Sequence, residues 1–170
     1  MKNFSSKLIL SSILVFMLFS SCKKNKDESY FVKFKLNGNW ITWTEGISEL
    51  GPDLLDNTKT NFYVASASKD QSQTFTIDLQ VDGASINTGS YDPDDHLILV
   101  SYTTGMNTQN YKDYGLDQAD NMPAPAFQLT LSSITDESIR GSFTGNYLTE
   151  LFSGETVTLT EGEFYVPRYR

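Results

Sequence analysis

The sequence predicts an all-β protein, an antiparallel β-sandwich of about eight or nine strands. Two observations support this fold class. Apolar and polar residues alternate in one segment after another between residues 30 and 167, which is the pattern of half-buried strands. Turn residues separate these segments at spacings of roughly 8 to 15 residues, which is typical of sandwiches, and a closed β-barrel is the alternative.

The first two predicted strands form a hairpin. The segment YFVKFKL, residues 30–36, places Tyr30, Val32, Phe34 and Leu36 on one face and its lysines on the other. Asn37-Gly38 follows, and this dipeptide tolerates the positive φ angles of a two-residue type I′ turn. The turn sets the expected cross-strand pairs, which are Leu36 with Asn39, Phe34 with Ile41, Val32 with Trp43, and, on the other face, Lys35 with Trp40.

The later strands repeat the same alternation. Apolar residues expected on the core face of these strands are Phe75, Ile77, Leu79, Val81, Phe127, Leu129, Leu131, Ile139, Phe143, Val157, Leu159, Phe164 and Val166. No segment of the mature chain shows a sustained period of 3.6 residues, so the class predicted is all-β, with at most a helical turn in a loop.

Residues 1–21 have the pattern of a secretory signal peptide. Lys2 and Lys7 precede an apolar stretch of 12 residues, LILSSILVFMLF, and two serines come just before Cys22. The apolar stretch is shorter than the roughly 20 residues that a transmembrane helix needs. The sequence therefore predicts export and then removal of this segment.

Cys22 is the only cysteine, and it lies at the expected cleavage point. FSSC, residues 19–22, resembles the lipobox of bacterial lipoproteins, in which the cysteine becomes the first mature residue and carries acyl chains. The resemblance implies lipidation of Cys22, and several acyl chains together anchor a protein durably. The alternative is an ordinary signal peptide followed by an incidental free cysteine.

Residues 22–29 are interpreted as the lipidated cysteine and a short charged tether, because KKNKDES contains no apolar side chain. Lysine, rather than aspartate, follows Cys22, which favours the outer membrane. KNKDE also resembles the export signal of Bacteroidota surface lipoproteins, so exposure on the cell surface is favoured over the periplasmic face.

Residues 30–170 are predicted to form a single β-sandwich domain. From Cys22 onward the chain carries 11 basic and 21 acidic side chains, a formal net charge of −10. This balance opposes phosphate binding, so no nucleic-acid partner is expected.

The sequence points to no catalytic residue and no cofactor. His96 is the only histidine and Cys22 is assigned to the anchor, so clustered histidine and cysteine metal ligands are not expected. Asp92, Asp94 and Asp95, in YDPDDH, are the only metal candidates, for calcium. Aspartate and proline are also turn formers, and a turn is the favoured interpretation.

The segment from Thr103 to Ala124 is predicted to be a long loop and the best candidate for ligand binding. It carries Tyr111 and Tyr114 near Asp117 and Asp120, and aromatic rings beside carboxylates suit a polar ligand such as a glycan. The favoured interpretation, however, is that the tyrosines fold back and cap one end of the sandwich.

A second resemblance concerns the C-terminal half. Gly141, Ser142, Phe143 and Gly145, followed by Val157, Leu159, Thr160, Gly162 and Phe164, are similar to strand motifs of small Bacteroidota lipoproteins of unknown function. The resemblance implies a single all-β domain behind a lipobox signal peptide. It implies no catalytic residue.

These features predict a lipid-anchored, non-catalytic binding or interaction module at the outer membrane. The membrane, reached through the anchor, and a glycan or an envelope protein are the expected partners. The alternative is a glycan-active enzyme that uses aspartate carboxylates.

Overall fold

The computed structural model describes residues 29–106, 108–116, 126–145 and 147–169, and in this part of the chain every regular element is a β-strand. The predicted signal peptide, Cys22 and the tether up to Glu28 lie outside the described residues. Within the described ranges, no helix is long and apolar enough to cross a membrane. The all-β class predicted from the sequence is confirmed.

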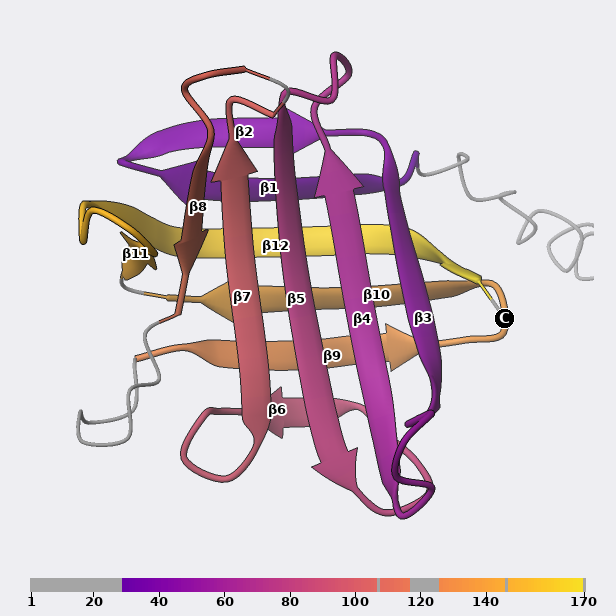
Figure 1. Cartoon of the computed structure of the whole chain (residues 1–170). Coiled ribbons are helices and arrows are strands. Elements are labelled where there is room, and N and C mark those ends of the chain that lie inside the picture. The colour runs from indigo at the N-terminus through magenta and orange to yellow at the C-terminus, as the bar shows by residue number, and fades with distance from the viewer. Residues whose placement is uncertain (1–28, 107, 117–125, 146, 170) are drawn as a thin grey trace, which may run out of the picture.

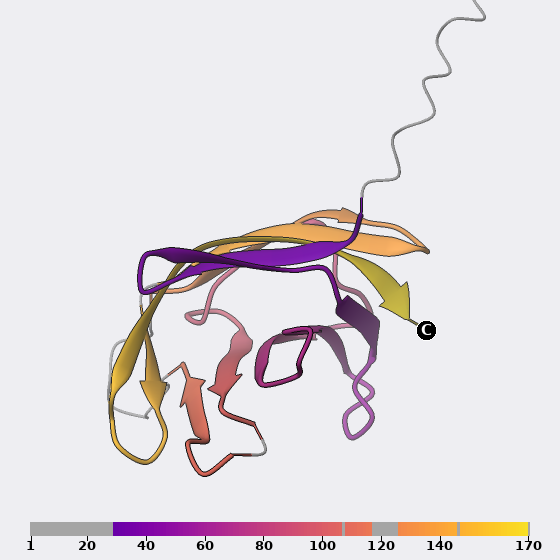
Figure 2. The same ribbon diagram turned by 90° about the horizontal axis from the view of Figure 1, so that it is seen from above.

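Two packed sheets, one in front of the other in Figure 1, make up the domain. The back sheet contains, in spatial order, β6 (Gly89–Tyr91), β9 (Gln128–Ile134), β10 (Ser138–Thr144), the middle of β12 (Thr156–Tyr169), β1 (Phe31–Leu36) and β2 (Asn39–Trp43). The front sheet contains β11 (Tyr147–Glu150), β8 (Lys112–Gly115), β7 (Leu97–Thr104), β5 (Gln73–Asp82), β4 (Lys59–Ala67) and β3 (Gly46–Pro52). Strands of one sheet run across those of the other, and Figure 2 shows the two sheets one above the other.

The last strand, β12, connects the two sheets. Its first three residues pair with β11, its middle pairs with β1 on one side and β10 on the other, and Arg168 and Tyr169 pair in parallel with β3. The first and last strands of the domain are therefore neighbours in the back sheet. Every other strand pair is antiparallel.

The predicted hairpin is confirmed in register. Asn37 and Gly38 have φ angles of 50° and 79°, as a type I′ turn requires. Leu36 pairs with Asn39 and Lys35 with Trp40, and the two remaining pairs are also those expected. The Lys35 Nζ lies 5.1 Å from the centre of the Trp40 ring on the outer face, a cation–π contact.

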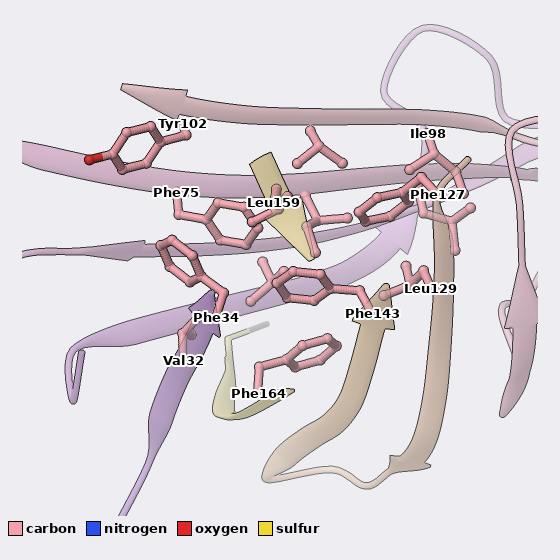
Figure 3. Close-up of a cluster of buried hydrophobic side chains, with 14 of the residues drawn as sticks. Val32, Phe34, Phe75, Ile98, Tyr102, Phe127, Leu129, Phe143, Leu159 and Phe164 are labelled. Carbon is pink, nitrogen blue, oxygen red and sulfur yellow. The ribbon is translucent and has the colours of Figure 1, made fainter. Parts of the chain in front are cut away.

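The core lies between the sheets and combines the predicted apolar residues with others that were not predicted, such as Ile98 and Tyr102 (Figure 3). Stacked phenylalanine rings cross it, with centroids 4.6 Å apart for Phe34 and Phe75, 5.2 Å for Phe75 and Phe143, and 5.8 Å for Phe143 and Phe127. Phe34 and Phe143 come from the back sheet and Phe75 from the front sheet, so this stack joins the two layers.

Twelve strands are present in the described residues, more than the eight or nine predicted. β6, β8 and β11 have only three or four residues each, too few to show an alternating pattern. The prediction of a structureless loop from 103 to 124 is wrong for its first part, because β7 continues to Thr104 and β8 turns back to pair with it. Residues 117–125 lie outside the described ranges.

Candidate functional site

The two tyrosines proposed from the sequence as a binding pair lie in different environments. Tyr114, on β8, is only 4% exposed and packs in the core with its ring centre 6.0 Å from that of Tyr102. Tyr111, just before β8, is 48% exposed. The structure therefore does not bring them together on one surface. Asp117 and Asp120, the other two predicted ligand residues, lie outside the described residues.

The segment around Asp92 forms a turn. The Asp92 Oδ1 accepts hydrogen bonds from the backbone N–H groups of Asp94 (3.1 Å) and Asp95 (3.3 Å), and the His96 N–H bonds the Asp92 carbonyl at 3.1 Å. This is the local bonding that aspartate makes in turns. Across the described residues, no group of three or more histidine, cysteine, aspartate or glutamate side chains is placed to hold a metal ion.

The outer face of the front sheet, which faces the viewer in Figure 1, is a different surface. Aromatic and polar side chains lie together on it. Strand register places Ile47, Ala65, Thr76 and Ser101 in one row across β3, β4, β5 and β7. The two inner side chains, Ala65 and Thr76, are short, so the row forms a trough beside Ile47.

The next row along the same strands forms a wall. Glu49, Tyr63, Asp78 and Leu99 are neighbours across the four strands and point to the same side as the trough. Tyr63 is half-buried between the fully buried Phe62 and Val64, so its backbone is held by the core while its side chain faces outward.

Two adjoining hollows, which we call together the tyrosine groove, lie on the two sides of this wall, one beyond the other along β3 and β4. The first has a volume of about 550 Å³, and Tyr30, Ile47, Tyr63, Ala65, Thr76 and Tyr169 are among its lining residues. The second, of about 480 Å³, has Tyr63 and Tyr169 in common with the first and adds Glu49, Pro52, Leu54, Asn61 and Asp78. Tyr63 and Tyr169 therefore stand where the two hollows meet.

The three tyrosines come from distant parts of the chain. Tyr169 reaches the groove because the end of β12 pairs in parallel with β3, which sets Tyr169 beside Glu49. Tyr30 precedes β1, and its ring lies 5.0 Å from that of Tyr165 on β12. Only Tyr63 belongs to the strands that form the floor, so both ends of the domain contribute to the groove.

The groove is acidic. Among the described residues that line it, Glu45, Glu49 and Asp78 are carboxylates, and there is no lysine or arginine. Burial raises the pKa of Asp78, and the nearby Asp53 carboxylate raises it further. The pKa of Tyr63 is raised by burial and then by Asp78 and Glu49. The Tyr63 hydroxyl therefore keeps its proton at neutral pH and can donate a hydrogen bond.

Asp53 supports Asn61, a lining residue of the second hollow, from outside the groove. Its Oδ2 accepts hydrogen bonds from Asn61 Nδ2 (2.8 Å) and Gln80 Nε2 (2.9 Å), and its Oδ1 accepts from the backbone N–H groups of Leu55 (2.7 Å) and Asp56 (2.9 Å). These bonds lower the pKa of Asp53, the Leu55 bond most strongly. Asn61, which lines the second hollow, is thus held in place by Asp53.

The groove was not predicted from the sequence, although strand β4 carries one signal of it. Outward positions of a strand on a solvated sheet face are usually polar. In β4 these positions include Tyr63, Ala65 and Ala67, an aromatic residue followed by two small ones. An outward pattern of this kind indicates a surface shaped for contact.

The fold and the groove together define a class, a small two-sheet β-module with an open, acidic, tyrosine-lined groove on the outer face of one sheet. Comparisons of the chain with protein-family models, with curated proteins and with solved structures found no match. The groove and the N-terminal sequence are therefore the features that bear on function.

Proposed function

We propose that this protein is a non-catalytic binding module that a lipid on Cys22 holds at the outer membrane, and that its ligand occupies the tyrosine groove. The tyrosine groove is the main structural observation that supports this proposal. Ligand sites are typically hollows with apolar and aromatic walls and a few well-placed polar groups. Tyr63, flanked by Glu49 and Asp78 above a floor of short side chains, has this character.

The anchor is supported by the N-terminal sequence. Cys22 follows a signal-like segment and two small residues, and residues 23–29 are charged. Seven residues reach about 25 Å at most when fully extended. Tyr30, the next residue, lines the groove. A lipid on Cys22 would therefore hold the rim of the groove close to the membrane surface, and we favour the outer face of the outer membrane.

An enzyme acting on glycans through carboxylates is the alternative. Such enzymes place two carboxyl groups on either side of the scissile bond. In the groove, Glu49 and Asp78 belong to the same row, with Tyr63 between them on the intervening strand. A sugar would meet the Tyr63 side chain before it could lie between the two carboxylates, and this arrangement favours binding over hydrolysis.

Cell fractionation tests the anchor. We expect the wild-type protein in the outer-membrane fraction and the Cys22→Ala variant in the soluble fraction of the envelope. Ser21→Ala is the matched control, since a small residue is retained before the cysteine, and it should behave as the wild type. Membrane association of the Cys22→Ala variant would contradict the lipid anchor.

Protease treatment of intact cells tests which face carries the domain. If the domain is outside the cell, the protein disappears while a periplasmic marker survives. Digestion only after the outer membrane is broken would place the domain in the periplasm and would contradict the favoured face.

A further inference from the structure

We infer that the ligand of the tyrosine groove is a carbohydrate chain without negative charges, seated with one sugar ring against Tyr63. This inference rests on the proposed binding function and specifies its ligand class. Three properties of the groove support it: its charge, its hydrogen-bonding groups and its shape.

The charge of the groove excludes anionic ligands. Glu45, Glu49 and Asp78 line it without a lysine or arginine among the described lining residues. An anionic ligand such as a nucleotide, a phosphorylated lipid headgroup or a uronic-acid polymer would lie within a few ångströms of these carboxylates. Like charges so close together near a protein surface repel each other. Neutral sugars and amino sugars avoid this repulsion.

The hydrogen-bonding groups of the groove fit a ligand that donates many hydrogen bonds. The carboxylates of Glu45 and Glu49 are acceptors, and Asp78 is an acceptor whenever it is ionised. A sugar presents a hydroxyl donor on nearly every carbon, and hydrogen bonds to a charged carboxylate are the stronger kind. A proline-rich peptide, which also docks in aromatic grooves, has carbonyl acceptors and few donors. The acceptor-rich lining therefore favours the carbohydrate.

The aromatic residues supply the apolar part of the contact. Sugar rings have faces of C–H groups, and a tyrosine ring can cover such a face while its hydroxyl bonds at the edge. Tyr63 is fixed by the core on both sides along β4, and Tyr169 and Tyr30 stand nearby. Rigid aromatic side chains lose little conformational entropy when they bind.

The shape of the groove favours a chain over a compact molecule. The two hollows meet at Tyr63 and Tyr169. From Ile47 to Pro52 they follow β3 for about 17 Å, five residues at the rise of an antiparallel strand. The short side chains of Ala65 and Thr76 keep the floor of the first hollow low, so one sugar ring can lie there against Tyr63 while the chain continues past Tyr63 into the second hollow.

Affinity electrophoresis of the full-length, detergent-solubilised protein tests the inference. The probes are neutral polysaccharides (mixed-linkage β-glucan, xylan, galactomannan and glycogen), the amino-sugar polymer chitosan, and polygalacturonate as the anionic comparison. Tyr63→Ala removes the aromatic surface, and Ala65→Arg fills the floor without removing a contact. Tyr111→Ala is the control, because Tyr111 is an exposed tyrosine that does not line the groove.

We expect at least one uncharged or amino-sugar polymer to retard the wild type and Tyr111→Ala equally, and polygalacturonate to retard neither. Tyr63→Ala and Ala65→Arg should each bind at least about ten-fold more weakly, the loss expected for a central aromatic contact. Melting temperatures check the fold of both variants. Because Ala65 points outward, its replacement keeps the test decisive if Tyr63→Ala is unstable.

Failure of this inference can be separated from failure of the proposed binding function. Proline-rich and lysine-rich synthetic peptides are measured with the same variants by fluorescence anisotropy. If only a peptide binds, and Ala65→Arg abolishes its binding, the groove is a binding site but the carbohydrate assignment is wrong. If no probe shows binding that depends on the groove, both proposals are overturned.

Discussion

In several turns, one aspartate or glutamate carboxylate accepts hydrogen bonds from nearby backbone N–H groups. These bonds stabilise the conformation of the turn. Asp70, between β4 and β5, accepts from the Ser68 Oγ (2.6 Å), the Ser72 N–H (3.1 Å) and the Ser72 Oγ (2.9 Å). These bonds stabilise the ionised form, the Ser68 bond most, and lower the pKa of Asp70 to about 2. Asp53 and Glu150 have lowered pKa values for the same kind of reason.

Replacement of Asp70 by asparagine should change how stability depends on pH. The pKa of Asp70 is lower in the folded state than its ordinary value of 3.8, so the ionised form contributes stability above about pH 4 and that contribution is lost as the pH falls towards 2. Urea midpoints of the wild type and Asp70→Asn should therefore differ at pH 6 and converge near pH 2. Asp94→Asn, at an exposed aspartate in another turn, is the control. A gap of constant size across this pH range would refute the explanation.

Strands β10 and β12 pack closely because a glycine on each strand lies opposite a phenylalanine on the other. On β10 and β12, Gly141 is paired with Phe164, and Phe143 is paired with Gly162. A Cβ atom on Gly162 would overlap the Phe143 ring, and one on Gly141 would overlap the Phe164 ring. Each ring thus covers the glycine of the opposite strand. This packing is a physical reason for the glycine and phenylalanine motifs in the C-terminal half of the sequence.

Gly162→Ala should destabilise the domain by about 1 to 3 kcal/mol, the usual cost of overpacking a core. The Phe143 ring stacks on Phe75 and Phe127, so it cannot move without disturbing other core contacts. Gly51→Ala is the matched control, because a Cβ there meets no atom within 4 Å and Gly51 is also a strand glycine. Urea unfolding measures both free energies. Equal stability of the two variants would show that the Phe143 ring can adjust to the added methyl group.

The molecule as a whole depends on its last strand. β12 pairs with β1, β3, β10 and β11, so it holds the two sheets together and places the first strand beside the last. Contacts between distant parts of the chain make folding slow, because the chain must close long loops before it gains their energy. The complete domain is thus needed before the core and the groove can form.

Removal of β12 should prevent folding. We expect a chain of residues 29–155 to show no cooperative urea transition by circular dichroism, because β1 and β10 would lose their shared neighbour and the core would lose Leu159, Phe164 and Val166. A chain of residues 29–170 is the control and should unfold in one transition. Cooperative unfolding of the shorter chain would mean that the remaining strands make a sufficient core.

The features predicted correctly depend on residues close together in the sequence. Alternation with period two identifies the strands and their buried faces, and Asn37-Gly38 sets the register of β1 and β2, including the Lys35–Trp40 contact. Tyr114 shows the limit of this reasoning. The sequence predicts a loop around it, but β8 pairs with β7, and this strand pairing turns the Tyr114 side chain into the core. A shift of one residue in register would have reversed that direction.

The amino-acid sequence was sufficient to determine the all-β class, the first hairpin and most of the core, because strand alternation and turn chemistry are local properties. The tyrosine groove was decided only by the tertiary structure. Tyr30, Tyr63 and Tyr169 come from the start, the middle and the end of the domain, and they meet because β12 leaves the back sheet and pairs with β3. That pairing joins segments more than a hundred residues apart, and no local pattern in the sequence encodes it.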